Sequence, residues 1–260
     1  MAGFSVTLVQ QPLVWHDPGA NRAGLARLLE PLAGRTDLIV LPETFTTGFS
    51  MDVERCGEPA AGATCDWLLE RAAVLDAAIT GSVITAAAGH YYNRLLWATP
   101  AGELRHYDKR HLFRMGREHE HFTPGKAAVI LEWRGFRICP LLCYDLRFPV
   151  FSRRRPGLDY ELLVYVANWP AARGYAWQQL LRARAIENQA YVVGVNRVGP
   201  DGAGVDYAGG SAALDYLGQP LVELGAAPEL VTVTLDVAGL RACRDKFPAH
   251  LDADRFTLES

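Results

Sequence analysis

Short, uninterrupted apolar runs constrain the fold of this chain more than any other feature of its sequence. They occur at residues 37–41 (DLIVL), 162–167 (LLVYVA) and 191–196 (YVVGVN). Such runs are typical of strands buried on both faces of a covered parallel sheet. Stretches with apolar residues at helical spacing stand between them, at 21–33, 64–76 and 175–188. This alternation predicts a layered α/β domain, which some schemes would class as α+β.

Antiparallel pairs are expected between these units. A Gly-broken strand at 78–88 precedes a partner at 91–99, and Arg134-Gly135 predicts the turn of a hairpin. The other predicted strands are the two arms of that hairpin and three more segments, at 128–133, 136–142, 4–10, 211–215 and 230–235. The chain has 260 residues and shows no linker or internal repeat. We therefore expect one domain over 1–260, with a polar tail at 237–260 that wraps the surface or a partner subunit.

Composition narrows the classes of protein. Half of the residues are apolar and 21% are charged, which is the balance of a folded chain. The formal net charge of −3 gives no electrostatic reason to expect a nucleic acid or an anionic membrane as partner. The five cysteines show no zinc-finger spacing, and neither a secretory signal nor a long apolar span is present. A reduced, cytoplasmic protein is the simplest interpretation.

A carboxylate directly follows one of the apolar strands. Glu43 comes after residues 37–41, where the chain leaves the sheet. The carboxyl ends of strands are where sites form in α/β sheets. A surface glutamate at the start of a loop is the alternative, although the following Thr-Thr-Gly-Phe run favours a tight turn that would position the side chain.

A dense basic and aromatic segment surrounds Lys109, in the run YDKRHLF at 107–113. A lysine in a desolvated site can stabilise an oxyanion or a thiolate, whereas a solvated basic patch is the ordinary alternative. Four histidines in this region raise the possibility of a metal hydrolase: His106, His111, His119 and His121. Their close spacing without a matching further ligand is weak evidence, so no metal is predicted.

A cysteine stands where an apolar strand meets a turn. The run LLCYDLRFP places Cys143 at this junction, and Cys139 lies within the strand. A nucleophile at such an elbow exposes its side chain while the next backbone amides point at a reacting oxygen. The alternative is a buried structural cysteine, which applies more strongly to Cys139.

Together these segments resemble the nitrilase (carbon–nitrogen hydrolase) superfamily. The resemblance rests on LPETF, YDKRHLF and CYDLRFP, which occur in that order with their Glu, Lys and Cys 66 and 34 residues apart. It extends over nearly the whole chain through the segments Asn168-Trp169-Pro170, RARAIENQAYVVGVNRVG and HLFRMGREHEHFTPG, the last two being similar to the ω-amidase-like branch. The resemblance implies a four-layer αββα sandwich and a homodimer or higher homo-oligomer.

The same resemblance implies a function and roles for residues. Members of that branch deaminate ω-amides of 2-oxo acids, notably 2-oxoglutaramate and 2-oxosuccinamate, without metal or organic cofactor. Cys143 would be the nucleophile, Glu43 the base, and Lys109 with the backbone amide of Tyr144 the oxyanion donors. The family's second glutamate would be Glu118, with Glu120 as the competitor.

The substrate pocket is predicted from chemistry. The carboxylate of such a small-molecule amide favours an arginine partner, and Arg173 is the candidate. Asn168 belongs to the same segment, and Phe45, Tyr144 and Trp169 are candidate walls. A nitrilase, an N-carbamoyl hydrolase or an aliphatic amidase would share the Glu-Lys-Cys set, and a non-catalytic binding module that keeps the fold is a further alternative.

Overall fold

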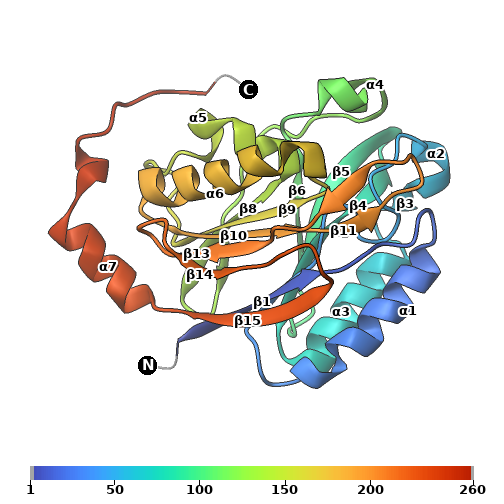
Figure 1. Ribbon diagram of the computed structural model, residues 1–260, viewed down its shortest axis with the longest axis horizontal. Helices are drawn as coiled ribbons and strands as arrows, with labels where there is room; N and C mark the ends of the chain where they lie inside the picture. Colours follow the sequence, from blue (N-terminus) through green and yellow to red (C-terminus); the bar gives the residue numbers. More distant parts are fainter. Residues whose placement is uncertain (1–2, 259–260) are drawn as a thin grey trace.

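The computed structural model describes residues 3–258 and contains two sheets stacked face to face (Figure 1). The first sheet has the order β15 (Glu229–Leu235), β1 (Phe4–Gln10), β2 (Leu38–Val40), β4 (Ala78–Ala87), β5 (His90–Ala98) and β6 (Leu104–Asp108), and β3 (Glu58–Pro59) pairs with β4. The second has the order β14 (Pro220–Glu223), β13 (Ala212–Leu214), β10 (Tyr191–Asn196), β9 (Leu162–Ala167), β8 (Phe136–Leu142) and β7 (Leu131–Trp133). A separate hairpin pairs β11 (Val198–Pro200) with β12 (Asp206–Ala208).

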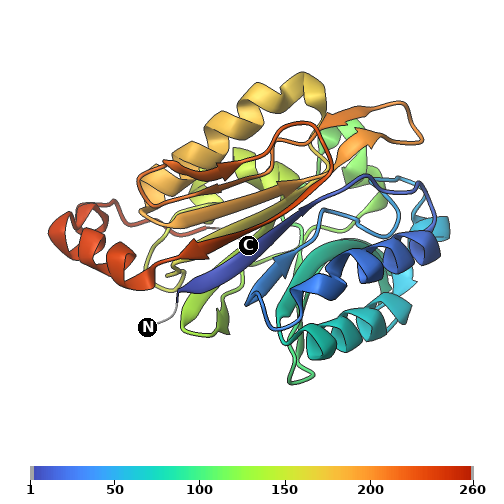
Figure 2. The same cartoon turned by 60° about the horizontal axis from the view of Figure 1, so that its bottom comes forward.

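Helices cover the outer face of each sheet. Helices α1 (Pro18–Leu29) and α3 (Ala63–Leu75) lie on the first sheet, and α6 (Gly174–Asn188) lies on the second (Figure 2). The predicted αββα sandwich is therefore confirmed. The short helices are α2 (Val53–Cys56), α4 (Glu118–His121) and α5 (Pro149–Ser152). Within the described part of the chain, no helix has the length and apolar character needed to cross a membrane.

The apolar runs are buried on both faces, as their composition predicts. In β2 and the residue after it, Leu38 and Val40 join the core between the sheets, whereas Ile39 and Leu41 pack under α1 and α3. Each such side chain contributes about 1.5–3 kcal/mol when it is fully buried. Because the strands β1, β2 and β4 run parallel, and β8, β9 and β10 do too, their carboxyl ends gather at one edge.

The predicted strands and long helices are present in the structure. The short strands β3, β11, β12 and β14 and the short helices were not predicted, and three further differences concern other segments. The first arm of the hairpin begins at Leu131 rather than at residue 128. Strand β6 was not predicted, because LRHYD is mostly polar and joins the sheet only through β5. The segment expected to be a polar tail contains helix α7 (Val237–Lys246), which docks on its own chain by burying Leu240 and by two hydrogen bonds of Arg244 to backbone carbonyls.

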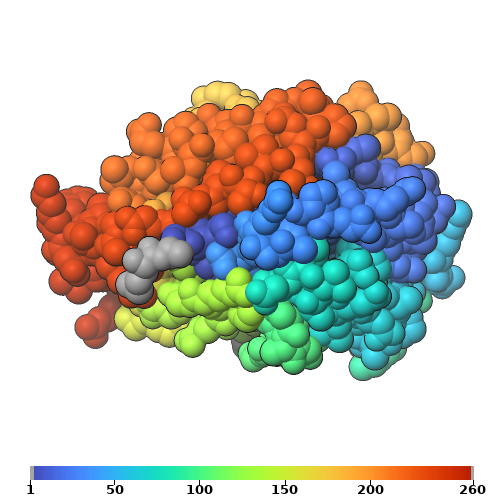
Figure 3. Space-filling model, turned by 90° about the horizontal axis from the view of Figure 1, so that it is seen from below, coloured from blue at the N-terminus to red at the C-terminus, as the bar shows by residue number. Residues whose placement is uncertain are grey.

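The C-terminal segment projects at one end of the molecule, away from α1 and α3 (Figure 3). Between α7 and residue 258 there is only one short helical turn, at Ala249–Leu251, and the residues described there are mostly exposed. The last two residues of the predicted tail, 259 and 260, lie outside the described part of the chain.

Candidate active site

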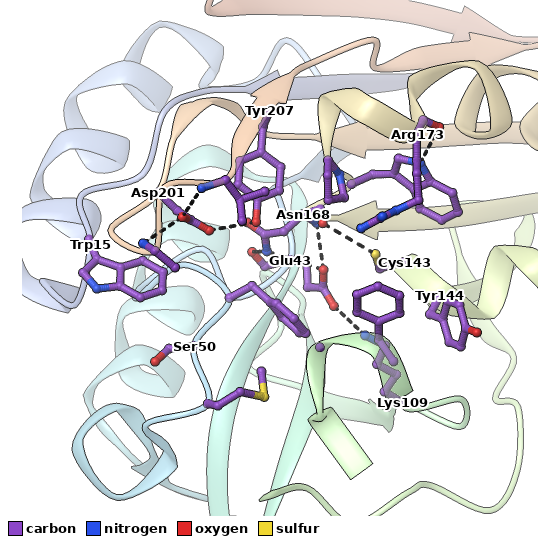
Figure 4. Close-up of a pocket in the computed structure, with 18 of the residues that line it drawn as sticks. Trp15, Glu43, Ser50, Lys109, Cys143, Tyr144, Asn168, Arg173, Asp201 and Tyr207 are labelled. Atoms are coloured by element: carbon purple, nitrogen blue, oxygen red, sulfur yellow. Dashed lines mark hydrogen bonds and ion pairs between the residues drawn. The ribbon is translucent and has the colours of Figure 1, made fainter. Parts of the chain in front are cut away.

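The two sheets bring four chemically important residues to one cavity. Glu43 follows β2, Lys109 follows β6, Cys143 follows β8 and Asn168 follows β9. All four line a cavity of about 350 Å³ (Figure 4). Residues far apart in the sequence therefore meet because their strands end at the same edge.

Lys109 lies between two carboxylates with no solvent exposure of any of the three side chains. Its Nζ donates to Glu43 Oε1 at 2.9 Å and to Glu118 Oε1 at 3.0 Å. Burial by itself lowers the pKa of Lys109, but the carboxylates of Glu118 and Glu43 outweigh it, so the pKa is raised. Lys109 is therefore a fixed cation. For Glu118, burial raises the pKa, with Lys109 opposing and Glu43 reinforcing the shift.

The backbone around Lys109 is held by close packing. Lys109 N donates to Asn93 O at 3.0 Å, and Lys109 O accepts from Gly125 N at 2.8 Å. A Cβ on Gly125 would lie 2.0 Å from Asp108 O, so only glycine fits at this approach. The Pro-Gly turn thus fixes the strand end that carries the lysine.

Two asparagines complete the partners of Glu43. Asn168 N donates to Glu43 Oε2 at 2.7 Å, and Asn168 Nδ2 donates to Glu43 O at 2.8 Å. Asn93, on β5, donates from Nδ2 to Glu43 Oε1 at 2.8 Å and to Glu118 Oε1 at 3.2 Å. The sequence interpretation missed Asn93, because a single polar residue inside a strand carries no motif of its own.

Cys143 occupies a strained backbone position. Its φ is +38°, a left-handed conformation that costs a non-glycine residue about 1–2 kcal/mol. Its Sγ lies 3.9 Å from Asn168 O, and the side chain is half-buried at the cavity. Burial and the Glu43 carboxylate raise the pKa of the thiol well above its ordinary value, against the opposing effect of Lys109. The resting form is therefore a neutral thiol.

Asp145 anchors the turn that carries Cys143, and it too was missed from the sequence. Its Oδ2 accepts from Leu142 N at 3.0 Å and from Tyr107 OH at 2.7 Å. Its Oδ1 accepts from His111 N at 3.0 Å and lies 2.7 Å from His111 Nδ1. This buried carboxylate links the end of β8 to the segment that follows β6. Burial and the neighbouring Asp145 carboxylate raise the pKa of Tyr107, so the phenol stays a donor.

The predicted pocket walls fall into two groups. Tyr144, Trp169 and Arg173 line the cavity together with Asn168. Phe45 does not line it: the ring is fully buried under the first sheet, against Trp67, and a Cβ on Gly81 would lie 2.8 Å from it. The turn after Glu43 directs the side chain of Phe45 back into the core. The prediction that Phe45 forms a pocket wall is therefore wrong.

The structure also separates the two glutamates that the sequence left open. Glu118 is buried and contacts Lys109, whereas Glu120 is exposed and pairs with Arg117 at 2.6 Å. His119 and His121 are exposed on the same helix, and His111 is bound to Asp145. Among residues 3–258, no group of three or more His, Cys, Asp or Glu side chains is placed to hold a metal ion.

Comparison with known proteins identifies the family. The model of the carbon–nitrogen hydrolase family matches residues 5–245. The chain therefore belongs to the carbon–nitrogen hydrolase family of the nitrilase superfamily, hydrolases that act on carbon–nitrogen bonds.

Relatives of known name span the whole chain. It is 49% identical over 259 residues to the ω-amidase YafV of Escherichia coli K12, covering 99% of this chain and 100% of that protein. It is 29% identical to the 2-oxoglutaramate amidase of Bacillus subtilis, covering 96% and 97%. The crystal structure of XC1258 from Xanthomonas campestris, a superfamily member with an arsenic adduct in its active site, is 53% identical with a TM-score of 0.97 over all of both chains.

Proposed function

We propose that this protein is an ω-amidase that hydrolyses the terminal amide of a small 2-oxo acid, 2-oxoglutaramate or 2-oxosuccinamate, to a carboxylate and ammonia. The observation that carries the proposal is the meeting of Glu43, Lys109 and Cys143 at one cavity. The whole-length similarity to proteins named ω-amidase and 2-oxoglutaramate amidase supports the choice of substrate class. The proposed reaction uses neither a metal nor an organic cofactor.

In the first half of the reaction, Cys143 Sγ attacks the amide carbonyl carbon and its proton passes to Glu43. Lys109 Nζ and the backbone N–H of Tyr144 stabilise the oxyanion of the tetrahedral intermediate, and one such donor contributes about 3 kcal/mol. Glu43 then transfers the proton to the departing nitrogen. The carbon–nitrogen bond breaks, ammonia leaves, and a thioester on Cys143 remains.

In the second half, Glu43 takes a proton from water as the water oxygen attacks the thioester carbonyl. The same two donors hold the second oxyanion. When it collapses, the carbon–sulfur bond breaks, the thiol regains its proton from Glu43, and the ω-carboxylate is released. Because the thiol rests in its neutral form, a base at the position of Glu43 is needed in both halves.

Glu118 orients Lys109 rather than reacting. Its Oε1 accepts from Lys109 Nζ, and its Oε2 accepts from Phe113 N at 2.6 Å, which fixes the carboxylate at both oxygens. Arg173 binds the substrate carboxylate, which lies at the opposite end of the substrate from the amide. Tyr144, Asn168 and Trp169 form the surrounding wall.

The assembly and extent of the protein are part of the same proposal. We infer one catalytic domain over 1–260, whose segment 237–260 is a C-terminal tail that begins with α7, and a homodimer or higher homo-oligomer. The exposed apolar side chains of α5 and α6, Val150, Tyr175 and Ile186, support self-association. The cytoplasmic location stays a prediction.

Ammonia release from a substrate panel tests the function. The panel contains 2-oxoglutaramate, 2-oxosuccinamate, glutamine, an N-carbamoyl amino acid and a simple nitrile. We expect release from the two 2-oxo amides, abolished in Cys143→Ala and Cys143→Ser without unfolding. Release only from the nitrile or the carbamoyl compound would reassign the substrate. Near-normal turnover by pure Cys143→Ala would reject the mechanism, and no release by the wild type would favour a binding module.

A further inference from the structure

A second guanidinium group faces the cavity besides that of Arg173. Arg147 lines the same cavity and ends the helical turn Cys143–Arg147. Its Cζ lies 4.9 Å from the centre of the Trp169 ring. Trp169 is held in turn, because its Nε1 donates to Arg173 O at 2.8 Å. Stacking occupies the face of a guanidinium and leaves its in-plane N–H donors free.

Neither arginine is neutralised within the protein. Among residues 3–258, no carboxylate lies within ion-pair distance of Arg147 or Arg173. Arg173 stacks 5.4 Å from the centre of the Phe113 ring. Within the described part of the chain, its Nη1 has only Met115 Sδ, at 3.7 Å, as a hydrogen-bond partner. Two unneutralised cations in a mostly apolar cavity attract an anion strongly, because few other groups compete for it.

The acidic residues of the cavity are already engaged. Asp201 Oδ1 accepts from the backbone N–H groups of Ala203 and Val205, both at 2.9 Å, and its Oδ2 accepts from Tyr207 OH at 2.9 Å. Glu43 is engaged by Lys109 and by two asparagines. An ammonium group entering this cavity would therefore meet two unpaired guanidinium groups, while the oxygens of Asp201 and Glu43 already accept hydrogen bonds from protein donors.

We propose that Arg147 is a specificity-determining residue, the second arm of a two-arginine clamp that selects ω-amides with a carboxylate and no 2-ammonium group. The clamp binds the substrate carboxylate and accepts a 2-oxo oxygen as a further hydrogen-bond acceptor. A 2-ammonium group in its place is repelled by both guanidinium groups. This inference rests on the proposed function, and it explains how one cavity distinguishes a 2-oxo acid amide from the corresponding amino acid amide.

The test compares kcat/KM for three amides of one chain length: 2-oxoglutaramate, glutaramate (the same acid without a 2-substituent) and glutamine. Arg147→Gln is the test variant. Arg114→Gln is the matched control, because Arg114 is exposed beside the cavity without lining it. The alkylation rate of Cys143 by uncharged iodoacetamide and the melting temperature report whether the site and the fold are intact.

Loss of a hydrogen bond to a charged group lowers kcat/KM by about 10- to 100-fold, so Arg147→Gln should lose this much on 2-oxoglutaramate and glutaramate, mainly through KM. Activity on glutamine should fall far less, which narrows the ratio between 2-oxoglutaramate and glutamine. Arg114→Gln should keep the wild-type ratio. An unchanged ratio in Arg147→Gln, in an enzyme whose wild type does hydrolyse 2-oxoglutaramate, overturns the clamp alone. If the wild type acts on 2-oxosuccinamate instead, the same comparison is made with 2-oxosuccinamate, succinamate and asparagine. Failure of the wild type on both 2-oxo amides overturns the proposed function and the clamp with it.

Discussion

Asn93 shows how much of the site depends on a residue with no reactive chemistry of its own. Its Nδ2 bridges the carboxylates of Glu43 and Glu118, and its Oδ1 accepts from Ser82 Oγ at 2.9 Å. The Ser82 hydroxyl in turn accepts from Thr44 N at 2.8 Å. Asn93 therefore sets the distance between the two carboxylates and ties the turn after Glu43 to the sheet.

Replacing Asn93 should impair turnover in two graded steps. Asn93→Ala leaves Ser82 Oγ without its acceptor and removes one donor from Glu43, which costs about 1–3 kcal/mol of stability and should lower kcat more than it raises KM. Asn93→Asp adds a third carboxylate beside two others and should be worse. Steady-state kinetics and urea unfolding check both variants. An Asn93→Asp enzyme as active as Asn93→Ala would contradict the electrostatic part of this account.

The effect of Glu43 on the protonation of Cys143 predicts that removing the Glu43 charge speeds alkylation of the thiol but slows amide turnover. The Glu43 carboxylate raises the pKa of the thiol, so removing that charge in Glu43→Gln should lower this pKa and increase the thiolate fraction at any pH below it. Alkylation by iodoacetamide should then become faster, and its pH profile should move to lower pH. Amide turnover should fall, because the variant has lost its base.

The measurement is the alkylation rate constant as a function of pH, with mass spectrometry to confirm modification of Cys143. Cys139 is the internal control, since it is fully buried within β8, the strand that Cys143 follows, and burial raises the pKa of its thiol to a range where it stays protonated. If the pH profile of Glu43→Gln shifted upward, Glu43 would not be the group that holds the thiol neutral.

Residues differ in how readable they are from the sequence. Glu43 and Cys143 each follow a recognisable apolar strand, so their meeting could be predicted from strand ends. Lys109 follows β6, whose polar sequence does not indicate a strand, and only the resemblance to a known family placed it beside them. Asn93 and Asp145 could not, because their importance lies in contacts with segments distant along the chain. Phe45 was misplaced because Thr44, with φ at +42°, redirects the chain in a way that no local pattern indicates.

At the scale of elements, the turn after β8 combines strain with anchoring. Cys143 has a positive φ, and the hydrogen bonds of Asp145 on either side of the turn hold it there. Strain of this kind persists only where the surrounding structure determines the backbone. The strain therefore serves to present the sulfur at the cavity.

This strain reverses an ordinary order of stability. Alanine is normally more stabilising than glycine, but at a left-handed position glycine is favoured. We expect Cys143→Gly to be about 1 kcal/mol more stable than Cys143→Ala. Cys139, within β8, provides the matched pair, where Cys139→Ala should be the more stable variant. Urea unfolding midpoints of the four variants decide the matter, and the same order at both positions would show that Cys143 carries no strain.

An element could be predicted from the sequence to the extent that its own residues, rather than its neighbours in space, determine its structure. Strands β2 and β9 are apolar throughout and β10 is apolar up to its last residue, Asn196, so burial on both faces could be inferred from the residues alone. Strand β6 and helix α7 are polar and acquire their structure from neighbours. For α7, the decisive contacts are long-range: Arg244 donates to Gln189 O and to Tyr160 O, both at 2.8 Å.

At the scale of the whole molecule, the two outer layers differ in what they expose. Helix α6 carries Tyr175 with 78% and Ile186 with 56% of its surface exposed, and Val150 on the adjacent α5 is 51% exposed. Tyr175 and Ile186 are eleven residues apart, three helical turns, so they lie on one face of the helix. An apolar face of this kind is a candidate for burial against a second copy, and two-fold pairing is the commonest arrangement.

The predicted homodimer should therefore depend on this face. We expect the wild type to sediment with the mass of two chains, and Tyr175→Glu combined with Ile186→Glu to yield monomers, because buried unpaired carboxylates cost several kcal/mol at an interface. Val74→Glu is the control, since Val74 is 55% exposed on α3 at the opposite layer. Sedimentation equilibrium over a range of concentrations makes the measurement. A double variant that stays dimeric would exclude this face of α6 as the interface. A monomeric wild type would reject the dimer itself. Dissociation of both Val74→Glu and the double variant would mean that added charge alone disrupts the assembly.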